Sequence, residues 1–189
     1  MMMQLKEAIT GRRSVRAYEE RPVPGELIRE LIGMGICAPT ASRMQPWAFA
    51  VVENREKMRE WSDKAKELLL GRMADNPYLR QYKAAMENKE FNIFYNAPCL
   101  LLIYGDTASP NHVVDCALAA QNIMLAAYEK GVGSCWVGFA TQVCNTPEIK
   151  DALGVPGDYR PVAPLILGYP RGQWPPVPRR EPVVFSWIK

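Results

Sequence analysis

The stretch Ala38-Pro39-Thr40-Ala41-Ser42-Arg43-Met44-Gln45-Pro46-Trp47 is the most informative part of this chain, and Arg12-Arg13-Ser14-Val15-Arg16 precedes it by about the length of a helix. In an extended chain, side chains at every second position share a face, so Arg12, Ser14 and Arg16 are predicted to point the same way. Guanidinium groups and a hydroxyl can all donate hydrogen bonds to phosphate oxygens. The earlier stretch therefore suits an anion that carries further polar atoms.

Three later segments complete a pattern that covers nearly the whole chain. They are an apolar helix with the glycine-containing turn after it, the end of a strand, and a basic motif near the C-terminus: Ala119–Ala127 with residues 131–138, Leu167-Gly168-Tyr169-Pro170, and Pro178-Arg179-Arg180-Glu181-Pro182. Each segment alone is a weak signal, but their order along the chain resembles that of the nitroreductase family of FMN-dependent NAD(P)H oxidoreductases. The resemblance says little about the substrate.

Composition limits the classes of protein that need to be considered. A chain of 189 residues fits a single domain, here residues 1–189, with 48% hydrophobic residues. Because the net charge is only +3, nucleic-acid binding, which needs a clustered basic stripe, is not expected. The apolar runs are too short or too interrupted to span a bilayer, and no secretory signal is visible, so we expect no membrane partner and a cytoplasmic location.

The cysteines indicate free thiols rather than a metal site or a disulfide framework. Five cysteines are present, none forms a Cys-x-x-Cys pair, and His112 is the only histidine. A zinc set of cysteine and histidine ligands therefore cannot be built within one chain. We expect no metal, and thiols kept reduced in the cytosol.

The hydrophobic periodicity predicts an α+β fold, with a central mixed or antiparallel sheet flanked by helices. Residues 71–95 are expected to form a helical insert, and residues 171–189 a proline-rich C-terminal extension. The expected helices are Gln4–Thr10, Glu26–Cys37, Glu56–Gly71, Leu79–Phe94 and Asn111–Lys130. The expected strands are Trp47–Val52, Cys99–Tyr104, Ser134–Phe139, Val162–Gly168 and Val183–Ile188.

The helix expected over Asn111–Lys130 is apolar nearly all round, which is typical of a helix that is buried on every side. It can belong to the core of a monomer or to an interface between subunits. The resemblance implies an obligate homodimer in which the long central helices pack together and two FMN sites lie at the interface. The extension 171–189 would then complete the partner subunit.

The resemblance also assigns roles to basic residues from both ends of the chain. Arg12, Arg13 and Ser14 would hold the FMN phosphate and ribityl hydroxyls, and Arg16 would approach the pyrimidine edge of the flavin. A fixed guanidinium there stabilises the negative charge that two-electron reduction creates. Of Arg179 and Arg180, one would close on the phosphate, and the spacing Arg-x-Pro favours Arg180. The alternative for both groups is a solvated basic segment.

The loop with Pro39, Thr40, Ala41, Arg43 and Gln45 matches the one that family members extend to the flavin of the partner. Two positions depart from the family: Thr40 stands where serine is usual, and Arg43 where asparagine is usual. Arginine cannot accept a hydrogen bond. Arg43 is therefore left with two readings, a contact with an acidic substrate group or cofactor phosphate, and a side chain that reaches solvent.

Cys135, Trp136, Val137 and Gly138 match the strand that passes the flavin ring in the family. There a backbone N–H, from Val137 or Gly138 in this chain, would donate to flavin N5. No side chain is assigned a catalytic role, because the flavin performs the chemistry. The implied function is hydride transfer from NAD(P)H through N5 to an electron-poor nitroaromatic or quinone, in a ping-pong sequence. The alternative is a flavin-binding carrier or sensor, or a flavoprotein reduced by a protein donor, without turnover of NAD(P)H.

Overall fold

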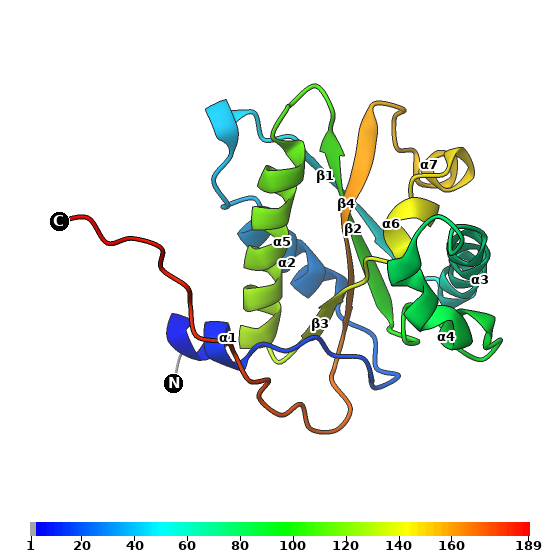
Figure 1. Ribbon diagram of the computed structural model, residues 1–189, viewed down its shortest axis with the longest axis horizontal. Helices are drawn as coiled ribbons and strands as arrows, with labels where there is room; N and C mark the ends of the chain where they lie inside the picture. The colour runs from blue at the N-terminus through cyan, green and yellow to red at the C-terminus, as the bar shows by residue number, and fades with distance from the viewer. Residues whose placement is uncertain (1–2) are drawn as a thin grey trace.

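The structure is a computed structural model that describes residues 3–189. A four-stranded sheet forms its centre, with the order β1-β2-β4-β3. All three pairings are antiparallel, so the sheet is antiparallel rather than mixed. Figure 1 shows this sheet between two groups of helices. The strands are β1 Trp47–Val52, β2 Cys99–Asp106, β3 Gly133–Trp136 and β4 Tyr159–Gly168.

Strand β2 is buried on both faces and divides the core into two layers. Its alternate residues point to opposite sides of the sheet, as the pleat requires. Cys99, Leu101 and Ile103 pack with α2 (Gly25–Gly35) and α5 (His112–Glu129). The other side chains of β2, among them Leu100 and Tyr104, pack with the helices of the opposite layer: α3 (Arg55–Gly71), α6 (Ala140–Val143) and α7 (Pro147–Leu153). The predicted α+β class is confirmed.

Helix α5 carries the N-terminal segment at one end and the loop after α2 at the other (Figure 1). Helix α1 (Leu5–Gly11) ends against the last turn of α5, where a Cβ on Gly11 would lie 2.2 Å from the hydroxyl oxygen of Tyr128. One side of α5 stays open: Val113, Val114 and Leu118 are exposed. The expectation of a helix buried on every side is therefore wrong for the single chain.

The expected helix Leu79–Phe94 is also wrong. The chain forms a 3-10 helix, η2 (Pro77–Tyr82), a short helix α4 (Lys83–Glu87), and then turns. Two asparagines explain the break, because asparagine side chains compete with helical hydrogen bonding. Asn88 Oδ1 accepts from the Glu90 N–H at 2.9 Å, and Asn92 Oδ1 accepts from the Phe94 N–H at 2.8 Å.

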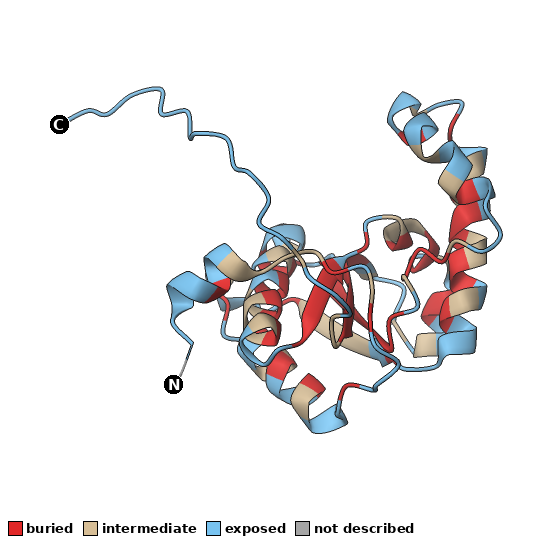
Figure 2. Cartoon of the chain, turned by 90° about the horizontal axis from the view of Figure 1, so that it is seen from below, coloured by how far each residue is buried: buried red, intermediate tan, exposed pale blue. Residues whose placement is uncertain are grey.

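Two expected strands differ from the structure as well. The strand expected over Ser134–Phe139 ends at Trp136, because Val137 and Gly138 turn the chain into α6 and accept the N–H groups of Ala140 and Thr141. The segment Val183–Ile188 forms no strand; it finds no sheet edge in its own chain and its large apolar side chains are exposed. Figure 2 shows the end of the extension leaving the body of the molecule in the colour of exposed residues. Within residues 3–189, no helix is long and apolar enough to cross a membrane.

Candidate functional site

The basic segment at the N-terminus lies beside strand β3. Ser14 forms a parallel bridge with Ser134, and the Val15 N–H donates to the Ser134 carbonyl oxygen at 3.0 Å. Because Val15 points into the core, the alternate side chains of Arg12, Ser14 and Arg16 lie on the other side. All three lie close enough to the Cys135 thiol to influence its pKa, which agrees with the common face predicted for them.

The Cys135 thiol stays protonated at neutral pH. Burial raises its pKa, and the charges of Arg16 and Arg12 together with a hydrogen bond to Ser14 only partly offset that rise. Nucleophilic and redox reactions of cysteine need the thiolate. Cys135 is therefore a small buried thiol rather than a reactive one.

Basic groups from the two ends of the chain meet at Arg12. Burial is the first cause that lowers the pKa of the Arg12 guanidinium, followed by the charges of Arg179 and Arg13. Neither Arg12 nor Arg179 forms an ion pair with an acidic residue in the part of the chain that the structure describes. Like charges at short range repel each other. The cluster would therefore be stabilised by a bound anion.

Arg13 and Arg180 take different positions. The Arg13 side chain donates to the carbonyl oxygens of Thr10, Arg12 and Pro175, at 2.7, 2.8 and 3.1 Å, so its guanidinium fixes the start of the C-terminal extension. Arg180 is exposed. Of the two arginines in the C-terminal motif, it is Arg179 whose charge acts on Arg12.

Of the two N–H groups considered for the turn after β3, those of Val137 and Gly138, one is free. The Val137 N–H donates to the Pro164 carbonyl oxygen at 2.8 Å, which uses the first of the two N–H groups considered for this site. The N–H of Gly138 has no backbone acceptor within residues 3–189, and Gly138 is exposed. Beside it, Trp136 lies with 36% of its surface exposed. Of these two groups, the Gly138 N–H is thus the one available to a ligand in this turn.

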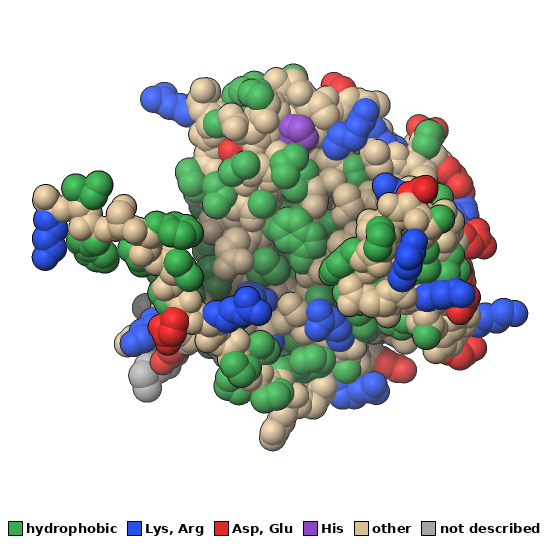
Figure 3. Space-filling view, viewed as in Figure 1, with side chains coloured by type: hydrophobic (Ala, Val, Ile, Leu, Met, Phe, Trp, Pro, Cys, Tyr) green, Lys and Arg blue, Asp and Glu red, His purple; other side chains and the backbone are tan. Residues whose placement is uncertain are grey.

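A cleft of about 710 Å³ opens at this turn, and it joins Arg16 and residues 135–138 to side chains that the sequence did not single out, among them Tyr78, Tyr82, Tyr95 and Phe139. We call it the aromatic cleft. Its rings face one another edge to face: Tyr82 lies 5.0 Å from Phe139 and 5.7 Å from Tyr78 between ring centroids. Figure 3 shows hydrophobic side chains gathered in the hollow of this face, with basic side chains along its lower edge. Its lining includes Arg16, Tyr78, Tyr82, Tyr95, Trp136 and Phe139.

The loop with Pro39, Thr40, Ala41, Arg43 and Gln45 lies elsewhere. Its Ala41 N–H donates to Oδ1 of the buried Asp115, in the first turn of α5, at 3.2 Å. The basic segment lies at the last turn of the same helix. Thirteen residues of α5, about 20 Å at 1.5 Å per residue, separate Asp115 from Tyr128. None of the five predicted loop residues lines the aromatic cleft.

The loop has an unusual backbone. Ser42, Arg43 and Gln45 have φ angles of 51°, 57° and 49°, in the left-handed region that non-glycine residues rarely adopt. The Asp115 hydrogen bond holds the start of this strained segment to the helix. Because Arg43 is exposed, its guanidinium is available to a neighbouring molecule.

Comparison with known proteins shows to which family a chain with this arrangement belongs. The model of the nitroreductase family matches residues 9–169. The chain belongs to the nitroreductase family. It is 32% identical over 172 residues, which cover 89% of this chain and 78% of the relative, to a protein of Methanothermobacter thermautotrophicus provisionally named NADH dehydrogenase/NAD(P)H nitroreductase.

Two solved nitroreductases share the fold of this family member. The crystal structure of a nitroreductase with bound FMN from Bacteroides fragilis has a TM-score of 0.84 and 26% identity, and covers 99% of this chain and 100% of its own. A nitroreductase with bound FMN from Desulfitobacterium hafniense has a TM-score of 0.83 and 26% identity, with coverage of 98% and 100%. The nitroreductase-like fold predicted from the sequence is thereby confirmed.

Proposed function

We propose that this nitroreductase-family chain is an FMN-dependent oxidoreductase. In this proposal it takes hydride from NAD(P)H and passes it to a planar, electron-poor acceptor such as a nitroaromatic or a quinone, in a ping-pong sequence. Membership of the family and the FMN bound in two solved neighbours support the cofactor. The name of the archaeal relative supports NAD(P)H as the co-substrate. The observation that carries the proposal is that Arg13 Nε donates to the Pro175 carbonyl oxygen at 3.1 Å and so holds the extension that brings the charge of Arg179 to Arg12.

The arginine cluster fits the phosphate end of FMN. A phosphate monoester offers three acceptor oxygens and a charge near −2, which compensates two guanidinium groups. Ser14, on the same face, adds a hydroxyl donor. Arg12 and Arg179 would bind the phosphate oxygens, whereas Arg13 holds the extension that carries Arg179. The convergence of both chain ends supports this assignment.

The free N–H of Gly138 and the exposed side chain of Arg16 fit the ring end of FMN. When bound, FMN accepts and donates hydride at N5, which is the chemistry that the side chains cannot supply. The Gly138 N–H would donate to N5 and orient the ring along residues 135–138. Arg16, whose guanidinium carbon lies 5.8 Å from the centroid of Tyr95, would stabilise negative charge at the pyrimidine edge. Cys135 takes no part as a thiolate.

We further propose that the site is completed in a homodimer. Within one chain, the loop 39–45 and the basic segment lie at opposite ends of α5. Side chains on α1 and α5, including Leu5, Ile9, Val113 and Val114, expose large apolar groups, and such groups are typical of interfaces. A second copy that covers α5 would bring its own loop to this chain's basic segment. Arg43 would then approach the bound cofactor or substrate.

The C-terminal extension supports the same arrangement. Phe185, Trp187 and Ile188 are 99%, 80% and 93% exposed, which is unfavourable for such apolar side chains in water. Arg13 fixes the beginning of the extension, and nothing in its own chain covers its end. We propose that residues 183–188 pack on the partner subunit. The five free thiols also fit a reducing compartment, and we place the protein in the cytoplasm on that ground.

The aromatic cleft indicates the class of acceptor. Tyr82, Phe139 and Trp136 offer ring edges and faces to a flat molecule, and offset or edge-to-face aromatic contacts are favourable. A cleft next to the Gly138 N–H would place such a molecule against the flavin ring. Because NAD(P)H would use the same cleft, the two substrates would bind in turn.

Anaerobic reduction tests the function. Purified protein loaded with FMN is mixed with NADH or NADPH without oxygen, and the visible absorption of the flavin is followed. We expect rapid loss of the oxidised spectrum and its return when a quinone is added. A protein that keeps its oxidised spectrum with both nucleotides would instead be a carrier, a sensor or a partner of a protein donor.

A further inference from the structure

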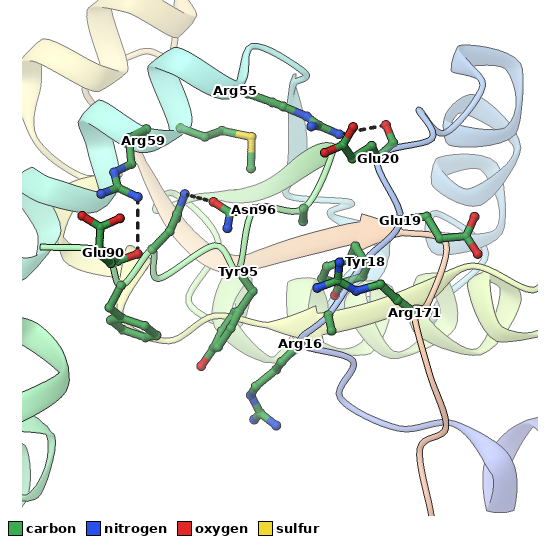
Figure 4. A pocket seen from close by; sticks show the side chains of 15 residues that line it. Arg16, Tyr18, Glu19, Glu20, Arg55, Arg59, Glu90, Tyr95, Asn96 and Arg171 are labelled. Atoms are coloured by element: carbon green, nitrogen blue, oxygen red, sulfur yellow. Dashed lines mark hydrogen bonds between the residues drawn. The ribbon is translucent and has the colours of Figure 1, made fainter. Parts of the chain in front are cut away.

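A second cleft, of about 610 Å³, opens next to the aromatic cleft and shares Arg16 and Tyr95 with it. We call it the arginine cleft. Figure 4 shows its walls: the start of α3 with Arg55 and Arg59, the turn that precedes β2, and the segment of residues 16–20. Arg171, which follows β4, closes the remaining side. None of the large apolar side chains that the molecule exposes lines this cleft.

The arginines of this cleft differ in whether their guanidinium groups already have hydrogen-bond partners. The Arg59 side chain donates to the carbonyl oxygens of Lys89 and Glu90, and Arg55 Nη2 donates to the carbonyl oxygen of Glu20 at 2.9 Å. Arg171 is held only by its backbone, whose N–H donates to the Ala17 carbonyl oxygen at 2.9 Å. Among residues 3–189 its guanidinium has neither a hydrogen-bond acceptor nor an ion-pair partner.

The acidic side chains leave the centre of the cleft positive. Figure 4 shows Glu20 beside Arg55 and Glu90 beside Arg59, so that these charges lie near one another at the rim. Glu19 points away from the cleft, whereas Arg171 is directed into it (Figure 4). Arg55 also begins α3, a helix of 17 residues whose N-terminal dipole adds a partial positive charge. Arg171 and Arg16 therefore remain without a counter-charge.

The wall opposite Arg171 is rigid. Tyr95 and Asn96 are held in the left-handed region, with φ angles of 52° and 54°, and the Asn92 Nδ2 group donates to Asn96 Oδ1 at 3.0 Å. The buried Lys66 ammonium donates to the Phe91 carbonyl oxygen at 3.0 Å and ties the same turn to α3. A strained backbone that its surroundings enforce is typical of binding sites. A wall formed in advance also lowers the entropy cost of binding.

We propose that the arginine cleft binds an anionic group, a phosphate or a carboxylate, on the small molecule whose ring occupies the aromatic cleft. The inference rests on the proposed function, because it extends the substrate site of that function. The two clefts are continuous at Arg16 and Tyr95, so one ligand can place its ring near Gly138 and its acidic end near Arg171. Two groups have the negative charge and acceptor oxygens that this cleft would bind: the phosphates of the pyridine nucleotide and an acid group on the acceptor.

Binding of inorganic pyrophosphate tests the cleft without turnover. Isothermal titration is performed on the FMN-loaded protein, in which the Arg12 cluster is occupied. Since a hydrogen bond to a charged group contributes about 1.5–3 kcal/mol, Arg171→Gln should weaken pyrophosphate binding about tenfold or more, and Arg171→Glu should weaken it further. Arg29→Gln removes one exposed charge on α2, outside the cleft, and should leave binding unchanged. Equal binding by wild type and Arg171→Gln, or no binding by wild type, would overturn the proposal.

Steady-state kinetics separates the two sources of the anion. The kcat/KM values of wild type and Arg171→Gln are compared for NADH, for NADPH, and for the acceptors 4-nitrobenzoate and neutral 4-nitrobenzyl alcohol. A loss confined to the nucleotides assigns the cleft to their phosphates, and a loss confined to 4-nitrobenzoate assigns it to the acceptor. A variant that matches wild type with all four would overturn the proposal. If wild type is not reduced by NAD(P)H at all, the proposed function fails. The pyrophosphate titration still decides whether the arginine cleft binds an anion.

Discussion

Arg12, Arg13, Arg179 and Arg180 are alike in the sequence, yet the structure gives them different surroundings. Arg12 is half-buried, and the Arg13 side chain donates to three carbonyl oxygens. Arg179 and Arg180 are both exposed, but it is the charge of Arg179 that acts on Arg12. Spacing alone favours Arg180 as the C-terminal phosphate ligand. The path of the extension, which Arg13 fixes, points to Arg179 instead.

This difference leads to a prediction for single substitutions. Arg12→Ala and Arg179→Ala should each weaken FMN binding about ten- to hundredfold, because each removes a charged hydrogen bond worth about 1.5–3 kcal/mol. Arg180→Ala, as the matched control, should change the dissociation constant by less than about threefold. Fluorescence titration of FMN into apoprotein measures all three. A larger loss for Arg180→Ala than for Arg179→Ala would reject our assignment.

At the level of helices and strands, much of the fold follows from residue patterns. The strand Trp47–Val52 is confirmed residue for residue, and the long helix His112–Glu129 lies within one residue of its expected limits at each end. These elements have continuous apolar periodicity or apolar runs. The break at Asn88 was missed because two side-chain turns overrode a helical pattern of apolar residues.

The candidate site could be predicted only in part, for a similar reason. The basic segment and the turn at Gly138 carry recognisable motifs, whereas the aromatic cleft is built from η2, β3 and the turn near Tyr95, which are distant in sequence. No spacing rule brings Tyr82 to Phe139 or Arg171 to Arg55. Only the packing of α3 against the sheet that contains β4 does. The free donor at Gly138 likewise depends on the bond between Val137 and Pro164 across two strands.

Two glycines of α2 provide a test of helix packing. A Cβ on Gly35 would lie 2.7 Å from the side chain of Ile123 on α5, whereas a Cβ on Gly33 would meet nothing within 4 Å. Gly33→Ala should raise the free energy of unfolding by about 0.5–1 kcal/mol through helix propensity. Gly35→Ala should lower it by about 1–3 kcal/mol through overpacking. Urea denaturation measures both, and equal stabilisation by the two substitutions would show that α2 and α5 do not pack this closely.

At the scale of the whole molecule, buried thiols link stability to pH. Cys99, Cys116 and Cys144 are fully buried, and burial raises the pKa of each thiol from 9.0 to about 12. The unfolded chain therefore loses these protons at lower pH than the folded chain. This contribution to stability is fully present below pH 9 and is lost between about pH 9 and 12, at roughly 1.4 kcal/mol per pH unit for each thiol.

Denaturation in the presence of reductant, repeated at rising pH, tests this linkage. The free energy of unfolding should fall steeply above pH 9. Cys144→Ala should reduce the slope by about 1.4 kcal/mol per pH unit. A slope that none of the buried cysteines affects would mean that other groups control the alkaline transition.

If basic groups from both ends of one chain, completed by the loop of a second copy, bind FMN, the flavin should sediment with a dimer. Sedimentation velocity recorded in the visible absorption of the flavin tests it most directly. We predict one boundary at the mass of two 21.3 kDa chains, with one flavin per chain. A monomer that carries a full complement of flavin would contradict the account, as would a protein that takes up no added FMN.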